Sequence, residues 1–367
     1  MIKGLYGAIA IIAACGSACA QTIVTQSEIS EVSNTLIDVI KSDYVFEAKG
    51  QEIAQALSEL QQSGQYDNAL TYEAFADALT QDLVTLSGDK HFKVNYNPGF
   101  IANRWSDEAE LQSSSDEETT ESDEAAFDWD LWYAQRENYG FQRLEILDGN
   151  IGFIRLNFFH PLNWSKGAID TAMEFVSDTE ALLIDLRTNN GGYSPSDAYI
   201  ASYFFEEGGG VWDTSYERRT GERETTSLFE EVNGDKYLNK PVYVLISDQT
   251  FSLGEQLAYG MKHFGKATLV GQTSAGAAHS IDIAKLSENF FVQVPISHGI
   301  HPVTQKDWEG VGVIPDIATS PEDALVIAHK EALEALIRAE TRDGVRKMYE
   351  RARDKLPVIS DPKEVED

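Results

Sequence analysis

The sequence predicts an α/β core that follows a helical N-terminal domain. Apolar residues recur at helical spacing over residues 27–86, whereas from about residue 141 strand-like and helix-like segments alternate. Between these regions, residues 106–130 consist mainly of acidic and small polar side chains. Alternating strands and helices favour a largely parallel sheet covered by helices, with active groups at the ends of strands. The 367 residues suffice for two folded units.

The N-terminus has the features of an export signal. Lys3 supplies a positive charge, residues 5–14 form a short apolar run, and 18-ACA-20 is a small-x-small cleavage site. We therefore expect a signal peptide over residues 1–20 that is cleaved after Ala20. The protein would then be periplasmic or secreted.

Both cysteines lie within this segment. If 12-IAAC-15 is instead a lipobox, Cys15 would carry a lipid anchor. Under cleavage after Ala20, Cys15 and Cys19 are both removed, and any nucleophile must be a hydroxyl, an amine or a carboxylate.

The charge balance excludes several classes of partner. Acidic residues outnumber basic ones by 60 to 29, for a formal net charge of −31. Such a chain is repelled by nucleic-acid phosphates and anionic lipid headgroups, so we expect no nucleic-acid partner and no binding to a membrane surface.

Residues 21–99 are expected to form the helical domain. Three apolar stripes indicate three helices, separated by turn-forming residues at 49-KGQ-51 and 63-SGQYDN-68. The stripes are Ile29, Val32, Leu36, Ile37 and Ile40; Ile53, Ala54, Leu57 and Leu60; and Phe75, Leu79, Leu83 and Leu86.

Residues 100–140 are expected to form an acidic linker. Eleven residues of 106–130 are Asp or Glu and none is Lys or Arg. Like charges at this density repel one another and leave little apolar surface to bury, so we assign no binding role to this segment.

Residues 141–320 are expected to form the α/β core, and residues 321–367 to add C-terminal helices. Short runs rich in β-branched and aromatic residues indicate five strands, and residues 281–298 indicate a hairpin-like pair. The five strands are 143–149, 151–159, 181–187, 241–247 and 267–271. Helical segments are expected over 166–178, from about Ser196, and after Ser252.

Ser252 stands where a predicted strand leads into a predicted helix. With Glu255 it forms the pattern S-x-x-E, which is the capping box that begins many ordinary helices. A serine at a helix N-terminus also faces free N–H groups and the positive end of the helix dipole, which favour developing negative charge. The residue type and position therefore fit either a helix cap or a nucleophile.

Gly191 and Gly192 follow another predicted strand, in 183-LIDLRTNNGG-192. One interpretation is a tight turn in which the glycines adopt positive φ angles. The other is that paired glycines expose backbone N–H groups, as an oxyanion hole requires. The pattern alone favours neither.

Other motifs are rejected. The segment 260-GMKHFGKAT-268 resembles a phosphate-binding loop, but Ala267 replaces the required hydroxyl and the loop would lead from helix to strand.

The residues around Ser252 differ from the α/β-hydrolase elbow G-x-S-x-G, because Thr250 stands in place of the first glycine. Asp316 and His329 nevertheless follow in the order of a hydrolase triad, so this interpretation stays a minor alternative. His298-x-x-His301 has no evident third ligand, so we expect no metal and no cofactor.

Several segments together resemble the carboxy-terminal-processing (tail-specific) serine peptidases. The resemblance is strongest to the branch that contains the interphotoreceptor retinoid-binding protein, and it covers most of the chain. It rests on the helical start 35-TLIDVIKSDYVFEAKGQEIAQAL-57, and on 148-DGNIGFIRL-156, 183-LIDLRTNNGG-192, 249-QTFSLGEQLAYGMK-262, 269-LVGQTSAGAAH-279 and 308-WEGVGVIPD-316.

That resemblance implies a crotonase/ClpP-like core in which Ser252 is the nucleophile. It also implies an oxyanion hole formed by backbone N–H groups at Gly191, Gly192 and Leu253. The family's PDZ domain is expected to be absent, because only about forty residues separate the strand that follows His91 from residue 141, too few for a domain of that size.

The chain departs from the family at the general base. Typical members carry a lysine at the position that is Ala277 here. We expect His279 to replace it, with Glu309 orienting the imidazole. His91 is a second candidate, although a structural histidine beside Asp89 is the simpler interpretation. The tricorn branch uses His and Glu, but its His position corresponds to Arg155.

Two functions are therefore open. One is a serine-type peptidase that hydrolyses peptides through an acyl-enzyme on Ser252, with a peptide or protein as its substrate. The other is a non-catalytic carrier of hydrophobic small molecules of the retinoid or fatty-acid type, which the lost lysine favours. A carrier predicts a closed apolar pocket.

Overall fold

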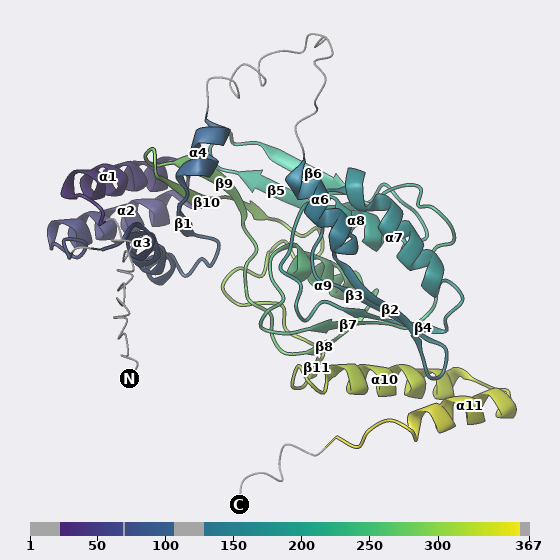
Figure 1. The fold of residues 1–367 in the computed structure, drawn as a ribbon. Coiled ribbons are helices and arrows are strands. Elements are labelled where there is room, and N and C mark those ends of the chain that lie inside the picture. Colours follow the sequence, from purple (N-terminus) through teal and green to yellow (C-terminus); the bar gives the residue numbers. More distant parts are fainter. Residues whose placement is uncertain (1–22, 69, 106–127, 360–367) are drawn as a thin grey trace, which may run out of the picture.

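A computed structural model describes residues 23–68, 70–105 and 128–359 (Figure 1). The predicted signal peptide with Cys15 and Cys19, and most of the predicted acidic linker, lie outside the described residues. Among the helices that are described, none is both long and apolar enough to cross a membrane.

The elements follow one another in an order that mixes helices and strands. The helices are α1 (Gln26–Asp43), α2 (Glu47–Gln62), α3 (Tyr72–Ser87), α4 (Pro98–Arg104), α6 (Trp129–Arg136), the 3-10 turn η1 (Asn138–Gly140), α7 (Leu162–Val176), α8 (Ser196–Ser202), α9 (Leu253–His263), α10 (Ala324–Ala339) and α11 (Asp343–Arg353). The strands are β1 (Lys93–Tyr96), β2 (Phe141–Leu147), β3 (Ile151–Leu156), β4 (Ala181–Asp185), β5 (Val211–Glu217), β6 (Arg223–Ser227), β7 (Val242–Ile246), β8 (Thr268–Gly271), β9 (Ser280–Lys285), β10 (Phe290–Gly299) and β11 (Ile317–Ala318).

A six-stranded sheet forms the centre of the α/β core. Its strand order is β11-β8-β7-β4-β3-β2, and all neighbouring strands are parallel except the antiparallel pair β2 and β3. The five strands expected between residues 143 and 271 are all present in this sheet. The largely parallel sheet predicted from the alternating pattern is thus confirmed, and the short edge strand β11 was not foreseen.

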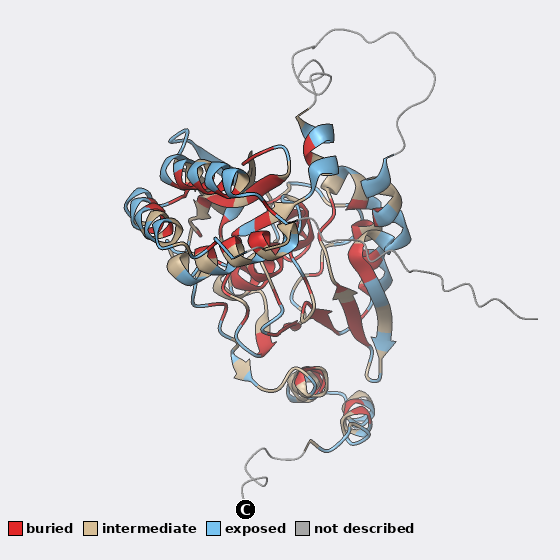
Figure 2. Cartoon of the chain, turned by 60° about the vertical axis from the view of Figure 1, so that its left-hand side comes forward, coloured by how far each residue is buried: buried red, intermediate tan, exposed pale blue. Residues whose placement is uncertain are grey.

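The sheet is buried on both faces because side chains alternate along each strand. Leu182 and Ile184 of β4 pack with α7, α8 and α9 in one cluster, whereas Ala181 and Leu183 pack with α10 and α11 in another. Buried residues fill the inner strands β3, β4, β7 and β8, which are red in Figure 2, whereas the edge strand β2 is mostly exposed or intermediate. The predicted C-terminal helices therefore complete one layer of the core.

The three predicted N-terminal helices are present, but the turn predicted at 49-KGQ-51 is wrong. These residues lie within α2, where Gly50 packs so closely on α1 that a Cβ would lie 2.9 Å from the carbonyl oxygen of Ile40.

Threonine caps begin two of the helices. Thr25 caps α1 by accepting the N–H of Glu28, and Thr71 caps α3 by accepting the N–H of Ala74, both at 3.2 Å. Gly88 ends α3 with a left-handed φ of 78°, as glycine does after many helices.

The N-terminal domain is not purely helical, because strand β1 lies within the predicted range 21–99. Strand β1 pairs with β10, which belongs to the predicted core, in a second sheet of order β1-β10-β5-β6 with β9 also beside β10. Phe290, Val292 and Val294 of β10 join the hydrophobic cluster of α1, α2 and α3. Figure 1 shows β9 and β10 alongside these helices. One strand thus ties the two units together.

The ends of the predicted linker are also structured. Helix α4 starts at Pro98, with Asn97 as its cap, and helix α6 ends the segment just before the core. Ala134 of α6 is fully buried, so this part of the segment packs rather than remaining solvated.

Candidate active site

Ser252 occupies a strained junction between β7 and α9. Its backbone has φ 50° and ψ −121°, and Leu253 begins the helix. Residues other than glycine pay about 1–3 kcal/mol for such angles, and they persist mainly where function requires them. A sharp turn of this kind between a strand and a helix presents the side chain of its central residue, as in the nucleophile elbow of hydrolases. The conformation favours a nucleophile over a simple cap.

The carboxylate of Glu255 accepts hydrogen bonds from both sides of this junction. Its carboxylate is fully buried and accepts the N–H of Ser252 at 3.0 Å, which is one half of the predicted capping box. It also accepts the hydroxyl of Ser274 and the N–H groups of Gly276 and Ala277, the last two at 2.7 and 2.9 Å. Burial raises the pKa of Glu255 above its ordinary value, against the opposing effect of these four hydrogen bonds.

Replacing Glu255 with alanine is expected to lower the free energy of unfolding by about 3–5 kcal/mol, because four donors would lose their acceptor, three of them buried backbone amides. Urea denaturation measures the change. Glu31→Ala, at an exposed position on α1, is the control and should cost less than about 0.5 kcal/mol. Equal costs for the two variants would show that Glu255 does not anchor the loop.

Two free backbone amides lie beside Ser252. Gly192 and Leu253 donate their N–H groups to no acceptor within the described part of the chain, as an oxyanion hole requires. Gly191 was also expected to contribute, but its N–H donates to the side chain of Asn189 at 2.8 Å. The role of Gly191 is steric instead. It has φ 89°, and a Cβ there would lie 2.7 Å from the Cβ of Ser252.

Asp89 joins the two candidate histidines. Its Oδ2 lies 2.6 Å from Nδ1 of His279, and its Oδ1 accepts the backbone N–H of His91 at 3.0 Å and lies 3.4 Å from His91 Nδ1. Burial alone would raise the pKa of Asp89, but its hydrogen bonds with His279 and His91 lower it far below the ordinary value. Asp89 is therefore an anion that orients both rings.

The predicted pair His279 and Glu309 is brought together, but Asp89 is the closer partner of His279. Nδ1 of His279 lies 3.6 Å from Glu309, whose carboxylate accepts the N–H of Ala278 at 2.6 Å. Burial lowers the pKa of His279, but the hydrogen bond to Asp89 and the charge of Glu309 raise it overall above the ordinary value. A histidine held in its charged form is a poor proton acceptor.

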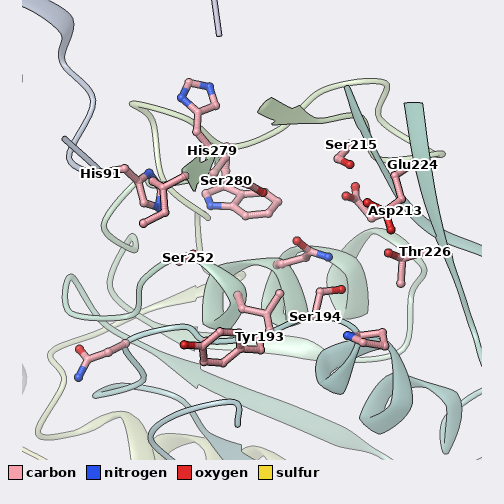
Figure 3. A pocket seen from close by; sticks show the side chains of 18 of the residues that line it. His91, Tyr193, Ser194, Asp213, Ser215, Glu224, Thr226, Ser252, His279 and Ser280 are labelled. Carbon is pink, nitrogen blue, oxygen red and sulfur yellow. The ribbon is translucent and has the colours of Figure 1, made fainter. Parts of the chain in front are cut away.

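His91, the second candidate for the general base, packs beside the junction that contains Ser252. Its ring packs against Phe251, the residue before Ser252, with 4.8 Å between ring centroids. Both ring nitrogens are buried: Nδ1 lies 3.4 Å from Asp89 Oδ1, and Nε2 has no hydrogen-bond partner in the described chain. Figure 3 shows the His91 ring on the Ser252 side of the site, whereas the ring of His279 points away from Ser252.

A cavity of about 940 Å³ opens beside these groups. Ser252, Leu253 and Gly192 line it, together with both histidines (Figure 3). Among the described residues that line this cavity, none is Lys or Arg. Ala277, at the family's lysine position, is fully buried against Glu255.

One donor set in the site has the composition of a metal site. Single ligand atoms of Asp89, His91 and Glu309 lie within 4.8 Å of one another. Asp89 is already bonded to His279, and Glu309 to the N–H of Ala278. We interpret the group as a hydrogen-bonded network, and the absence of a metal remains a prediction.

The minor alternative of an α/β-hydrolase triad is excluded. Asp316 pairs with Lys262 at 2.8 Å, and Nε2 of His329 lies 2.7 Å from the carbonyl oxygen of Asp148. Neither residue lines the cavity with Ser252. Arg155 pairs with Asp185 at 3.2 Å and is likewise remote from the serine.

The chain is similar in sequence to carboxyl-terminal-processing peptidases. Carboxyl-terminal-processing peptidase 1, chloroplastic, of Arabidopsis thaliana is 28% identical over 184 residues, which is 49% of this chain and 36% of that protein. A carboxyl-terminal-processing protease of Synechocystis is 26% identical over 167 residues, 46% of this chain and 37% of that protein. The matches thus span little more than a third of the length of these relatives.

A solved structure supports the fold. A candidate peptidase from Parabacteroides merdae superposes with a TM-score of 0.56 at 16% identity, covering 86% of this chain and 98% of that one. Residues 150–319 match the profile of peptidase family S41. Residues 18–127 match the N-terminal domain of peptidase S41 in eukaryotic IRBP. With both domains matched in order, the chain belongs to peptidase family S41.

Proposed function

We propose that the chain is an exported serine-type peptidase that hydrolyses peptide bonds through an acyl-enzyme on Ser252. The observation that carries the proposal is the strained backbone of Ser252, which places the residue in the wall of a cavity beside two free amides. The pattern of residues 1–20 supports export, for which the N-terminal residue of the mature protein is the measurement.

In this mechanism the hydroxyl oxygen of Ser252 attacks the carbonyl carbon of the substrate. His91 accepts the hydroxyl proton on Nε2, and Asp89 holds the opposite side of the ring and stabilises the imidazolium that forms. The N–H groups of Gly192 and Leu253 stabilise the oxyanion. His91 then gives the proton to the leaving nitrogen as the C–N bond breaks.

Hydrolysis of the acyl-enzyme completes the cycle. Water attacks the ester carbon and gives a proton to His91. The bond between this carbon and the serine oxygen then breaks, His91 returns the proton to the oxygen of Ser252, and the carboxylic product leaves. We assign the base to His91 rather than to the expected His279, because His279 is bonded to Asp89 and its ring points away from Ser252. His279 would instead fix the position of Asp89.

The carrier function receives less support from the cavity. A carrier predicts a closed apolar pocket, whereas serine, threonine and acidic side chains line much of this cavity. The match to the N-terminal domain found in IRBP is a likeness in sequence that does not itself supply such a pocket.

A fluorophosphonate probe tests the proposal. We expect a stoichiometric adduct by intact mass, mapped by peptide digestion to the segment that contains Ser252. Native protein and protein unfolded in urea are compared, because only the folded site activates the hydroxyl. Absence of an adduct on the native protein at high probe excess would refute the peptidase and favour the carrier.

A further inference from the structure

The β5–β6 hairpin forms the wall of the cavity that lies away from His91 (Figure 3). In the antiparallel register Ser215 is opposite Glu224, and residue 213 pairs with Thr226. Directly opposite residues share one face of a sheet, and so do residues two apart along a strand. The register therefore places all four side chains on the face that lines the cavity, and Figure 3 shows them gathered there.

Two of these side chains are carboxylates without a counter-ion. Neither Asp213 nor Glu224 forms an ion pair with any described residue, and no lysine or arginine lines the cavity. Asp213 is half-buried on β5, and Glu224 is exposed at the rim on β6. The hairpin wall therefore presents two acidic side chains and no basic one to the cavity.

The carboxylate of Asp213 is desolvated and has no positively charged neighbour among the described residues that line the cavity. Burial raises its pKa to about 6, and the nearby charge of Asp307 adds to the increase, against a hydrogen bond from the N–H of Thr214. A carboxylate that loses solvation without gaining a positive partner is destabilised, and a ligand cation would reverse that effect.

A second observation marks this cavity as a place for a ligand. His91 is only 9% exposed and lines the cavity, its Nδ1 lies 3.4 Å from Asp89, and its Nε2 lacks a hydrogen-bond partner in the described chain. Ser252 and the free amide of Leu253 lie on the same wall. A peptide bound there would extend from these groups toward the hairpin.

We propose that Asp213 and Glu224 form a subsite for a cationic side chain, so that the cavity selects peptides containing arginine or lysine. The proposal rests on the proposed function for its peptide ligand, and it extends that function by naming the substrate class. The same two charges repel a peptide's α-carboxylate, so the hairpin wall would hold an internal residue rather than a free C-terminus. Arginine fits best, because its planar fork can engage a carboxylate through two hydrogen bonds.

Binding of fluorescein-labelled alanine hexapeptides tests this subsite. Each peptide carries one arginine, moved through the six positions in turn, and is paired with a peptide carrying citrulline, which has the same shape without the charge. Binding is measured by fluorescence polarisation on Ser252→Ala protein, so that no peptide is cleaved. At one position at least, arginine is expected to bind about tenfold more tightly than citrulline.

The double variant Asp213→Asn/Glu224→Gln, made in the same Ser252→Ala background, should reduce that ratio to about one while leaving citrulline binding unchanged. Glu73→Gln removes one exposed negative charge on α3 and controls for general attraction to an acidic protein. The subsite would be overturned if arginine peptides bind no better than citrulline peptides, or if neither peptide binds. It would also be overturned if the arginine preference survives in the double variant or falls equally in Glu73→Gln.

The two proposals can fail separately. If Ser252 is not a nucleophile, the fluorophosphonate adduct is missing, but the arginine preference in binding remains. If the subsite is wrong, the adduct forms and hydrolysis shows no preference between arginine and citrulline peptides.

Discussion

Replacing Ser252 with alanine is expected to abolish peptide hydrolysis and fluorophosphonate labelling, with a loss in kcat on the order of 10⁵-fold. The hydroxyl oxygen of Ser252 is the only protein atom that forms a covalent bond to the substrate carbon in the proposed mechanism, and alanine removes it. The measurement is the initial rate of hydrolysis of a quenched fluorescent peptide, together with the intact mass after labelling.

Ser252→Gly is the matched variant, because it removes the same hydroxyl and also relieves the strained backbone. At φ 50° and ψ −121° a glycine avoids the steric cost that any side chain pays, so Ser252→Gly should be about 1 kcal/mol more stable to urea than Ser252→Ala. Both variants should be equally inactive. Equal stability of the two would mean that the junction relaxes and is not held in a strained form, and measurable turnover by either would remove Ser252 from the chemistry.

The central sheet could be predicted from sequence because its inner strands are nearly continuous apolar runs. Residues 181–185 and 242–246 are buried on both faces, and Asp185 at the end of β4 is their only charged residue. The helical stripes of the N-terminal domain were equally clear. Ser252 could be placed at a junction because one such run precedes it and an amphipathic pattern follows it.

The β5–β6 hairpin gave no comparable signal. Its strands face a cavity on one side, so polar residues occupy most positions, and only Trp212 on β5 is fully buried. The contribution of β10 to the N-terminal core was also hidden. Phe290 and its neighbours are as apolar as any core strand, but nothing local indicates which of two domains they pack against.

The histidine network depends on contacts between distant parts of the chain. Asp89 and His279 are separated by 190 positions, and the strand pair β1–β10 brings the two domains together. The short spacing of Asp89 and His91 in 88-GDKH-91 was visible, but a local Asp–His contact has the same pattern whether it is structural or catalytic. Only the packing of His91 against Phe251 separates the two interpretations.

Replacing His91 with glutamine is therefore expected to lower kcat/KM on the order of 10³-fold, which is the usual contribution of a general base. Glutamine preserves much of the side chain's volume but cannot accept and return a proton. His279→Gln should cost only about tenfold, because His279 acts through Asp89 rather than on the substrate. Both variants are compared with wild type by steady-state kinetics, with urea denaturation to check folding.

The pH profile distinguishes a positioning role for His279 from a merely structural one. His279 supplies a positive charge next to Asp89, with Glu309, Asp307 and His91 as the other ionisable neighbours. Without that charge, Asp89 is an uncompensated anion beside the general base, so the acid limb of the kcat/KM profile should move to higher pH in His279→Gln. An unmoved limb would make His279 a packing residue. A larger loss of kcat/KM in His279→Gln than in His91→Gln would return the role of base to His279, because the ring that removes the serine proton must be the one whose loss costs more.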